Sequence, residues 1–341
     1  MVRIAVTGAS GMLGSALIKK DWPDVEWLGI DVRPPPTTSW EAFRRIDVRD
    51  ADALTTALRG IDVLVHAAAA LPSHPAAEIT SVDVHGTEAV LAAVRSAGVD
   101  RLVHVSSTAV YGLPELCPTP EDYPCRPVDP YSAAKKSAEE RVERARRDGL
   151  CAPILRPKTF LGENRLGLFA MLFEWADDGR DFPLLGGGRH RAQMLDVEDL
   201  CSAVRAACER PDRDVDDTFN IGSARFGPLR EEFQAVLDAA GHGRRVRTLP
   251  VAPAVTALRL LAALRVSPVY RRLIHKLTRD SYVSIDKAAE RLGFAPVHGN
   301  EESLLRTYEW WRRAAGKSRP AGRTHQDPWH QGALRLAKVF Y

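Results

Sequence analysis

Short apolar runs alternate with helix-patterned segments through the first half of the chain, and this alternation limits the fold more than any other feature. The runs are almost continuously apolar, as strands buried on both faces of a parallel sheet are. The expected strands are Arg3–Thr7, Glu26–Asp31, Val63–Ala67, Leu102–Ser106 and Pro153–Leu155. The expected helices are Met12–Lys20, Ala51–Leu58 with Asp50 as its N-cap, Ile79–Ser96 ended by Gly98, and Ser132–Arg147 ended by Gly149. The pattern predicts an α/β protein with a doubly wound parallel sheet covered by helices.

A glycine-rich segment, Thr7-Gly8-Ala9-Ser10-Gly11-Met12-Leu13-Gly14, lies where the first strand should meet the first helix. At such a junction the first glycine permits a tight turn, the second lets the backbone approach a pyrophosphate, and the third lets the helix pack on the strand. Phosphates would rest on unpaired N–H groups at the positive end of the helix dipole. The segment predicts a dinucleotide site in a Rossmann-type fold, with cofactor contacts from Gly8, Ser10, Gly11, Met12, Leu13 and Gly14.

Asp31 ends the second expected strand, 17 residues after Gly14. A carboxylate at this place accepts both ribose hydroxyls of NAD and repels the 2′-phosphate of NADP. Arg33 stands two residues further on and would instead favour a phosphate. We predict NAD in preference to NADP as the cofactor.

The alternation of strands and helices weakens beyond about residue 157. We expect a helix at Leu166–Ala176, a turn at the GGGRHR segment, a helix at Asp196–Glu209 and a strand at Phe219–Ile221. The sequence over 228–341 is then mostly helical, with a polar loop at Lys317–Pro328 and an apolar end at Gly332–Tyr341. The predicted organisation is a nucleotide-binding domain over 1–165, with a return segment near 196–222. A smaller, mostly helical substrate domain and C-terminal tail take 166–195 and 223–341.

Composition and charge exclude several classes of protein. The 341 residues carry 47 Lys and Arg against 44 Asp and Glu, a net charge of +3, without the dense basic stripe of a nucleic-acid binder. Five cysteines show no CxxC pair and no metal-ligand spacing, so we expect reduced thiols and no metal. The opening MVRIAVTG already forms a strand and turn, and the apolar stretch Ala252–Leu264 is too short to cross a bilayer. We expect a cytoplasmic protein with no membrane partner.

Tyr131 and Lys135 are four residues apart at the start of an expected helix, so both project from one face. A free tyrosine has a pKa of about 10 and is a poor base at neutral pH. The Lys135 ammonium and an oxidised nicotinamide would favour the phenolate. Tyr131 would then take a proton from a substrate hydroxyl or return one to a carbonyl. Lys136, one position out of register, is not expected to take part.

These segments together resemble the extended short-chain dehydrogenase/reductase family. The TGASGMLG segment is similar to the family's TGxxGxxG pattern, and Asp47-Val48 matches its Asp–aliphatic pair beside the adenine. His66-Ala67-Ala68-Ala69 matches its HxAA stretch, whose short side chains admit the cofactor. The resemblance implies cofactor contacts from Asp47, Val48, Ala67, Ala68, Ala69, Tyr131 and Lys135. It covers residues 1 to roughly 315, densely over the first 165.

The same resemblance assigns the segment after the fifth expected strand. In VSSTAVYG the family's catalytic Ser/Thr maps to Ser107, which would act with Tyr131 and Lys135, and Thr108 is a second expected substrate contact. Ser106 and Tyr111 are expected to be structural, and His66 to be a packed strand-end residue. In SVDVHGT, Asp83 stands where the family has an Asn that braces the central strands. An Asp has no amide donor, so we expect that brace to be rearranged.

Family members with this pattern include 4-epimerases, 4,6-dehydratases and reductases of nucleotide sugars. Dehydratases carry an Asp–Glu pair after the catalytic Ser/Thr, where this chain has Thr108 and Ala109, so elimination is disfavoured. Epimerisation needs only groups that this sequence contains. Tyr131 deprotonates a sugar 4-hydroxyl while hydride moves to NAD, the transient 4-keto intermediate rotates in the site, and hydride returns to its other face. We predict an NAD-dependent nucleotide-sugar 4-epimerase.

Two alternatives stay open. The segments LRPKTFLG and DKAAERLGFAP resemble family patterns, but Thr159 replaces an Asn that holds the diphosphate in galactose-type epimerases. Arg191 stands one residue before the position of the family's phosphate-binding arginine, and Gln193 takes the place of an Asp. Lys158 either compensates for these differences by binding a phosphate or faces solvent. One alternative is an NAD(P)-dependent alcohol dehydrogenase or ketoreductase on a small or sterol-like substrate, with Val255–Leu264 lining an apolar pocket. The other is a non-catalytic dinucleotide-binding protein.

The resemblance also implies a homodimer paired through Ile79–Ser96 and Ser132–Arg147.

Overall fold

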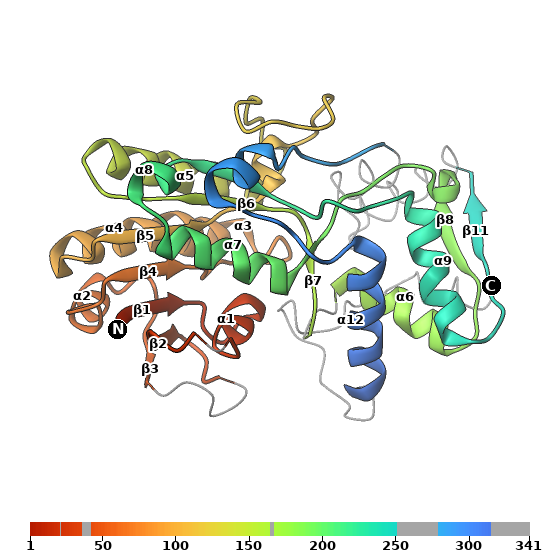
Figure 1. The fold of residues 1–341 in the computed structure, drawn as a ribbon, viewed down its shortest axis with the longest axis horizontal. Helices are drawn as coiled ribbons and strands as arrows, with labels where there is room; N and C mark the ends of the chain where they lie inside the picture. Colours follow the sequence, from red (N-terminus) through yellow and green to blue (C-terminus); the bar gives the residue numbers. More distant parts are fainter. Residues whose placement is uncertain (21, 36–41, 164–166, 251–278, 315–341) are drawn as a thin grey trace.

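A seven-stranded sheet with every adjacent pair of strands parallel forms the centre of the molecule (Figure 1). The structure is a computed structural model and describes residues 1–20, 22–35, 42–163, 167–250 and 279–314. The strands lie in the order β10-β6-β5-β4-β1-β2-β3. Their bounds are Thr218–Ile221 (β10), Ile154–Pro157 (β6), Arg101–Val105 (β5), Val63–His66 (β4), Val2–Thr7 (β1), Val25–Asp31 (β2) and Ala42–Arg45 (β3).

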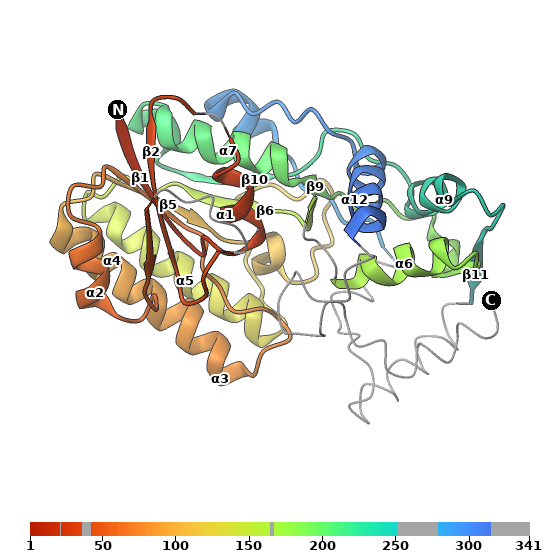
Figure 2. The same cartoon turned by 90° about the horizontal axis from the view of Figure 1, so that it is seen from below.

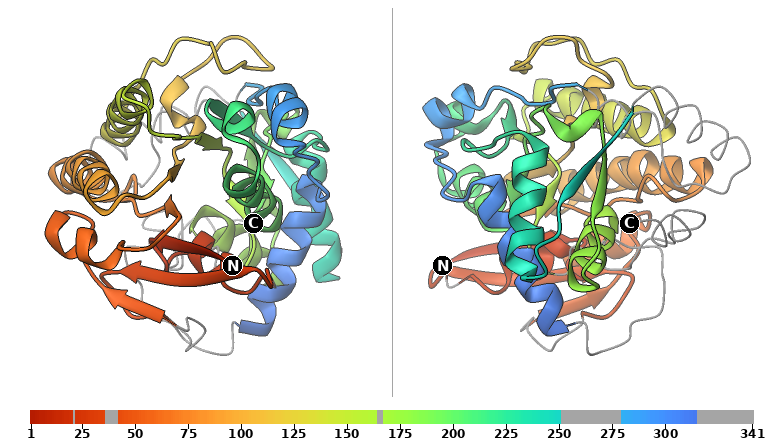
Figure 3. Two further views of the ribbon diagram at one scale, coloured as in Figure 1. Left: turned by 60° about the vertical axis from the view of Figure 1, so that its left-hand side comes forward. Right: turned by 90° about the vertical axis from the view of Figure 1, so that its right-hand side faces the viewer.

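Helices cover both faces of this sheet (Figure 3). One face packs against α2 (Ala51–Ala57), α4 (Gly86–Ala97) and α5 (Pro130–Arg147), and its core includes Ala5, Leu64 and Leu102. The alternate residues of the same strands, Ile4 and Val65 among them, face α1 (Met12–Leu17) and α7 (Val197–Glu209). Because both faces are covered, the strands are apolar along their whole length, as their sequences predict. The predicted Rossmann-type class is confirmed.

The strand order reverses next to β1. The chain leaves β1 toward β2 and β3 on one side and returns to β4 on the other. In open α/β sheets a ligand crevice forms at such a switch point, outside the carboxyl ends of the strands. Here those ends are Thr7 of β1 and His66 of β4, which are paired in register. The fold therefore places the glycine-rich segment and the Ala67–Ala70 segment at the two lips of one crevice.

A second group of elements has its own hydrophobic core and lies beside the sheet (Figures 1 and 2). It comprises α6 (Gly167–Asp177), β8 (Phe182–Leu185), the 3₁₀ turn η3 (Gly186–Gly188), α9 (Leu229–Ala240), β11 (Val246–Leu249) and α12 (Asn300–Ala314). Phe173 and Trp175 of α6 and Tyr308 of α12 are buried in this core. The strands β7 (Phe160–Leu161) and β9 (Leu195–Asp196) pair where the chain passes between the two groups. The predicted boundaries at 165, 195 and 222 stay predictions.

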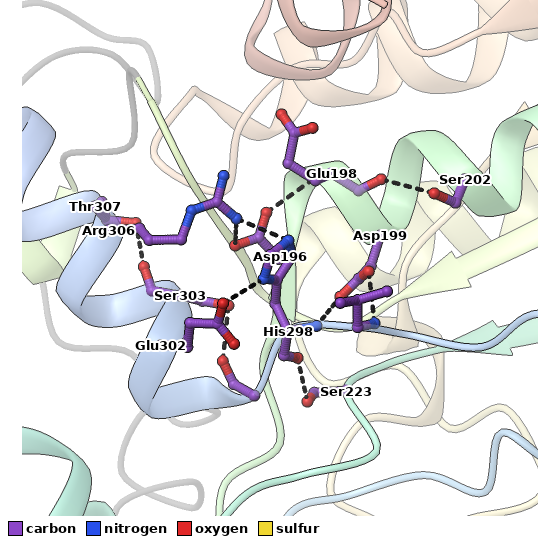
Figure 4. A network of polar contacts seen from close by, with 12 residues as sticks. Asp196, Glu198, Asp199, Ser202, Ser223, His298, Glu302, Ser303, Arg306 and Thr307 are labelled. Carbon is purple, nitrogen blue, oxygen red and sulfur yellow. Dashed lines mark hydrogen bonds and ion pairs between the residues drawn. The ribbon is translucent and has the colours of Figure 1, made fainter.

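A polar network joins α12 to the start of α7 (Figure 4). Arg306 of α12 donates to the carboxylate of Asp196 at 3.1 Å and to Nε2 of His298 at 2.9 Å. His298 contacts Glu302 through Nδ1 at 2.8 Å, which matches a neutral ring protonated at Nδ1. The carboxylate of Asp199 accepts the backbone N–H groups of Val297 and His298. These contacts hold the helical group against the sheet's outer helix layer.

Most predicted elements have counterparts in the structure, with shifts at their ends. The helix expected at Ile79–Ser96 starts earlier, as α3 (Ala76–Ile79), and passes through a π-helical turn, η1 (Thr80–His85), before α4. Gly98 ends α4 with a φ of 73°, and Asp50 caps α2 by accepting the Ala53 N–H, both as predicted. The helix expected at Met12–Lys20 ends at Leu17, followed by a turn.

Five strands were not predicted: the two-residue strands β7 and β9, and also β3, β8 and β11. The sequences of the last three, AFRR, FPLL and VRTL, carry exposed arginines or a proline and lack alternation, and they form at a sheet edge or in a two-stranded pair. The predictions for Leu166, 255–264, 317–328 and 332–341 lie outside the described residues. Within the described part of the chain, no helix is long and apolar enough to cross a membrane.

Candidate cofactor and catalytic site

A cleft of about 480 Å³ lies at the carboxyl ends of β1, β2, β4 and β5. It brings together residues from seven separate segments of the chain. Those predicted as site residues and found in its lining are Gly8, Gly11, Met12, Leu13, Asp31, Asp47, Val48, Ala67, Ala68, Ala69, Tyr131 and Lys135. The lining does not include the predicted residues Ser10, Gly14, Ser107, Thr108, Thr159 and Arg191.

The glycines in the loop between β1 and α1 let its backbone approach neighbouring backbone closely, so that the loop forms a narrow cradle. Gly8 has a φ of +75°, and a Cβ atom there would lie 2.8 Å from the Ala68 backbone nitrogen. A Cβ on Gly14 would lie 2.6 Å from the Cα and carbonyl oxygen of Ala9 and from the Gly8 oxygen. Gly14 is therefore needed for α1 to start against the loop, although it does not line the cleft. Only glycine satisfies both close approaches.

Asp31 is held at the end of β2 by backbone N–H groups. Its two carboxylate oxygens accept from Ser10 N and Arg33 N, each at 3.0 Å. The Ser10 hydroxyl donates to the Arg33 carbonyl at 2.7 Å, so Ser10 orders the loop from behind the cleft wall. The oriented carboxylate still has lone pairs for a pair of ribose hydroxyls. The cradle and this carboxylate fit NAD. The exposed Arg33 side chain also lines the cleft, as does Asp47, which is paired with Arg49.

The well-capped N-terminus of helix α5 positions Tyr131 and Lys135. Asp129 and Ser132 form a capping box, and Pro130 takes the first helical position. This start places Tyr131 in the first turn, at the cleft wall, and Lys135 one turn later on the same face. Lys135 is buried, and its Nζ donates to the Val105 carbonyl at 3.2 Å. The predicted pair is therefore present in one wall with the cofactor cradle.

The two serines after β5 have different surroundings. Ser106 lines the cleft, and its hydroxyl donates to the Glu139 carboxylate at 2.5 Å. Glu139 forms a buried ion pair with Arg156 at 2.7 Å, which confirms the structural role expected for Ser106. Ser107 accepts the Ala109 N–H at 3.2 Å and caps the 3₁₀ turn η2 (Thr108–Tyr111). Its catalytic role stays a prediction.

Tyr111 belongs to the same buried network rather than to the cleft. Its hydroxyl donates to Asn220 at 2.7 Å and accepts from Arg156 at 2.9 Å. Burial raises the pKa of Tyr111 to about 12, against the opposing effect of Arg156. A phenol so held serves the packing between β5, β6 and β10, as the sequence predicts.

His66 and Asp83 support the cleft from behind. The His66 ring contacts the hydroxyls of Thr7 at 2.8 Å and Thr87 at 3.2 Å, and burial lowers its pKa to about 3, so it is a neutral packed residue as predicted. One oxygen of Asp83 accepts the Ala70 N–H at 2.6 Å, while the other is buried with no hydrogen-bond partner among the described residues. Burial raises the pKa of Asp83. This is the rearranged brace, and it holds the Ala67–Ala70 lip of the cleft.

The predicted substrate contacts are less close to the cleft. Thr108 lines a separate small cavity, and its hydroxyl donates to the Pro157 carbonyl at 3.3 Å. Thr159 contributes its carbonyl to the Leu195 N–H beside the β7–β9 pair. Arg191 is exposed and pairs with Asp280 at 3.4 Å. Its guanidinium is therefore already engaged by a carboxylate.

Two other sequence expectations near this region have clear outcomes. Gln193 is buried and bridges Ser223 and Val283 at 2.8 and 2.9 Å, a structural role. Lys158 does not face solvent, as one reading of the sequence allowed, because its side chain is buried. All five cysteines are free thiols, as predicted. The described residues hold no group of three or more His, Cys, Asp or Glu side chains arranged for a metal.

Comparison with known proteins gives matches over most of the chain. The sequence pattern of the NAD dependent epimerase/dehydratase family matches residues 4–222. Uncharacterized protein y4nG of Sinorhizobium fredii is 34% identical over 338 residues, which cover 97% of this chain and 84% of that protein. A 4-hydroxy-2-methyl-3-oxo-4-farnesyl-3,4-dihydroquinoline-1-oxide ketoreductase of Stigmatella aurantiaca is 30% identical over 89% of this chain and 95% of its own length.

A nucleotide-sugar enzyme is similar in structure over nearly the same range. The dTDP-glucose 4,6-dehydratase DesIV of Streptomyces venezuelae, solved with NAD bound, superposes with a TM-score of 0.74 at 26% identity, covering 92% of this chain and 98% of its own. A UDP-glucose 4-epimerase of Mycolicibacterium smegmatis is 30% identical over 70% of this chain and 83% of that protein. The chain belongs to the NAD dependent epimerase/dehydratase family and is an NAD-dependent enzyme of the extended short-chain dehydrogenase/reductase type.

Proposed function

We propose that the protein catalyses the 4-epimerisation of a nucleotide sugar through a transient 4-keto intermediate, with Tyr131 as acid and base. The observation that carries this proposal is the single cleft wall in which Tyr131 and Lys135 stand beside the glycine cradle and Asp31. Thr108 and Ala109 stand where the family's dehydratases carry an Asp–Glu pair, so these two positions supply no second acid–base pair for elimination. Epimerisation requires only the groups that are present.

The chain's own residues would handle the proton. Bound NAD supplies the site that accepts hydride from the sugar and gives it back. Tyr131 takes the proton of the 4-hydroxyl through its phenolic oxygen and returns it to the same oxygen of the substrate. The Lys135 ammonium stabilises negative charge that develops beside it, and two of its three N–H groups remain after the bond to Val105. Ser107 would orient the substrate oxygen.

A second candidate function is a ketoreductase that consumes NADH in a net reaction. The ion pair between Arg191 and Asp280 favours this candidate, because the arginine expected to bind a substrate phosphate already has a carboxylate partner. The similarity to the Stigmatella ketoreductase over 95% of that protein's length points the same way. Both candidates use the same Tyr131 proton transfer, so they differ in the substrate and in whether the cofactor is regenerated.

The test is proton NMR of the purified protein with catalytic NAD and each of UDP-glucose, UDP-galactose and their N-acetyl and uronate relatives. We expect a new anomeric signal from the 4-epimer of one substrate, without net NADH. No new signal with any member of the panel contradicts the epimerase proposal. With stoichiometric NADH in place of catalytic NAD, reduction of a 3-oxo ester or a cyclic ketone with oxidation of the NADH would establish the ketoreductase instead.

Tyr131→Phe separates chemistry from cofactor binding. We expect turnover to fall at least about 100-fold, the usual loss for a general acid–base group, while NAD affinity stays within about threefold. Lys135→Met should lower turnover similarly. Lys136→Met is the matched control, because Lys136 is half-exposed and pairs with Glu140 on the same helix. Unchanged turnover in Tyr131→Phe would exclude the proposed mechanism.

We also propose that the protein is a homodimer that pairs through the helices predicted for this role, which correspond to η1–α4 and α5. These elements contact one another and cover the same face of the sheet, so their outer surfaces form one side of the molecule. Light scattering after size-exclusion chromatography is expected to give twice the chain mass of 37.6 kDa. A mass of one chain at micromolar concentration would contradict the pairing.

A further inference from the structure

Lys158 is a buried lysine at the end of β6 that neither the cofactor cradle nor the proton transfer uses. Its side chain is 5% exposed. Its Nζ donates to the carbonyl oxygen of Ser281 at 2.9 Å and to the Ser281 hydroxyl at 3.2 Å. An ammonium group has three donors, so one N–H direction is left over.

Within the part of the chain that the structure describes, this ammonium has no carboxylate partner. The described residues include no Asp or Glu within ion-pair distance of Lys158. Residues 251–278, which precede Ser281 in the chain and are not described, contain no Asp or Glu in their sequence. A buried charge without a partner is unfavourable and is normally compensated by an ion pair or a ligand. Burial lowers the pKa of Lys158 to about 8, and only the nearby Cys117 opposes this shift.

The Lys158 side chain lines a cavity of about 30 Å³. Because one water needs roughly 10–15 Å³ of such space, the cavity admits about two oxygen-sized atoms. That is the size of a carboxylate and too small for a phosphate with its four oxygens. Among the described residues that line the cavity, Lys158 is the one cation, and the others bring hydroxyl, amide and apolar groups.

The cavity adjoins the predicted substrate region. Its lining includes Thr108, the expected substrate contact next to Ser107, and Ala109. Two residues beyond Lys158, Phe160 lines the cofactor cleft. The cavity and the cleft are therefore lined by the same two stretches of chain, residues 106–109 and 158–160.

We infer that Lys158 and Ser281 form a binding site for a carboxylate group of the substrate. The inference rests on the proposed function in placing the substrate in the adjoining cleft, and it narrows the substrate to one that carries a carboxylate, such as a uronate sugar. The ammonium would supply the charge and its third N–H, and the Ser281 hydroxyl a second donor. The same contacts would then compensate the buried charge, for which the described residues provide no carboxylate.

Other charged groups near the cavity do not compete for this role. Arg191 and His190 both lie within ion-pair distance of Asp280, and the Arg191 guanidinium also lies 4.7 Å from the ring centre of Tyr282. The remaining titratable groups that face Lys158 are the phenols of Tyr111 and Tyr282 and the Cys117 thiol, whose Sγ donates to the Asp280 carbonyl. None of these binds an anion at neutral pH as an ammonium does.

The first test does not depend on the reaction. The NAD-bound protein, labelled with ¹³C at the lysine ε-carbon, is titrated by NMR with and without 100 mM sodium acetate as the probe, and Lys158→Gln identifies the signal. We expect Lys158 to titrate near pH 8 without acetate and at least half a pH unit higher with it, because a bound carboxylate stabilises the ammonium. Sodium chloride at equal ionic strength and the Lys136 signal are the controls. A Lys158 titration that acetate does not move would overturn the inference.

The second test uses substrate. Lys158→Gln is expected to raise the KM for a uronate substrate at least tenfold while changing the KM for the corresponding neutral sugar less than threefold. Lys136→Gln should change neither. In the wild type the KM for the uronate should rise as the pH passes 8, because the ammonium loses its charge. Equal changes for both sugars would mean a structural role only. If acetate shifts the Lys158 titration but no sugar in the panel is converted, the carboxylate site is supported and the epimerase proposal is excluded.

Discussion

His66, Asp83 and Glu139 are buried polar side chains that form the layer behind the cleft, and each holds a different part of it. His66 ties Thr7 at the end of β1 to Thr87 at the start of α4. Asp83 holds the Ala70 N–H, and Glu139 receives the Ser106 hydroxyl and the Arg156 guanidinium. Buried polar groups of this kind stabilise a fold only in one protonation state, so the pH dependence of stability reports on them.

The clearest case is His66, whose pKa falls to about 3 because burial penalises the imidazolium and the Lys135 charge repels it. In the unfolded chain the ring titrates near 6.5. Below pH 6.5 the unfolded state therefore binds a proton that the folded state does not, and stability is lost as the pH falls from 6.5 toward 3. The expected loss from His66 between pH 7.5 and 5 is about 2 kcal/mol.

Urea unfolding at these two pH values checks this, with His66→Asn and the exposed His85→Asn as a matched pair. His66→Asn should be less stable at pH 7.5 but lose about 2 kcal/mol less than the wild type on acidification. His85→Asn is the control and should keep the wild-type pH dependence, because the His85 side chain stays exposed in the fold. An identical pH dependence in the His66 variant would refute the assignment.

At the scale of elements, the junction between β1 and α1 depends on backbone approaches that a side chain would block. The loop is held by Asp31 at one end and meets the Ala67–Ala68 segment at the other. The start of α1 then packs on the loop through Gly14. Strand, loop and helix are thus a single unit, and a shift in any one of them moves the amides that face the cleft.

Gly14→Ala is expected to weaken NAD binding at least about tenfold, because its Cβ would meet backbone atoms of Gly8 and Ala9 at 2.6 Å and push α1 away. Gly98→Ala is the control. Its φ is +73° but the space around it is open, so it should cost about 1 kcal/mol of stability and leave NAD affinity unchanged. Isothermal titration with NAD and urea unfolding measure the two effects. Equal NAD affinities in the two variants would count against the close-packed junction.

At the scale of the whole molecule, the alignment of the helical group with the sheet depends on contacts between distant parts of the chain. Figure 4 shows the contacts that serve this alignment around Arg306 and Asp196. The Asp196 side chain is almost fully buried, and burial raises its pKa while Arg306 opposes the shift. Asp196 also caps α7 by accepting the Glu198 N–H. The pair therefore joins a helix start to the neighbouring helical group.

Arg306→Gln should destabilise the protein by about 1–3 kcal/mol, because it leaves the Asp196 carboxylate buried without its cation. Asp196→Asn keeps a capping side chain, and in that background Arg306→Gln should cost less than about 1 kcal/mol. A double-mutant cycle by urea unfolding measures the coupling. The exposed pair Arg312–Asp177, at 3.4 Å, is the control and should show at most about 1 kcal/mol. A coupling no larger than that of the control would contradict the proposed role.

The sequence by itself determined the parallel sheet, the glycine cradle, Asp31 and the pair Tyr131–Lys135. Each of these depends on residues close together in the chain: an apolar run, a spacing of glycines, a strand end, a capped helix start. Local sterics and helix geometry dictate their arrangement before any long-range contact forms. Their relative placement also follows, because parallel strands bring their carboxyl ends to one edge.

Only the tertiary structure decided which polar groups are buried and what they contact. Lys158 meets Ser281 across 123 residues of chain, Arg306 meets Asp196 across 110, and Asp83 keeps one oxygen unpaired behind the cleft. The strands β8 and β11 likewise exist only because they pair with each other. No local pattern specifies such contacts, because the burial of a charge and the identity of its partner are properties of the packed chain, set by which distant segments fill the space around it.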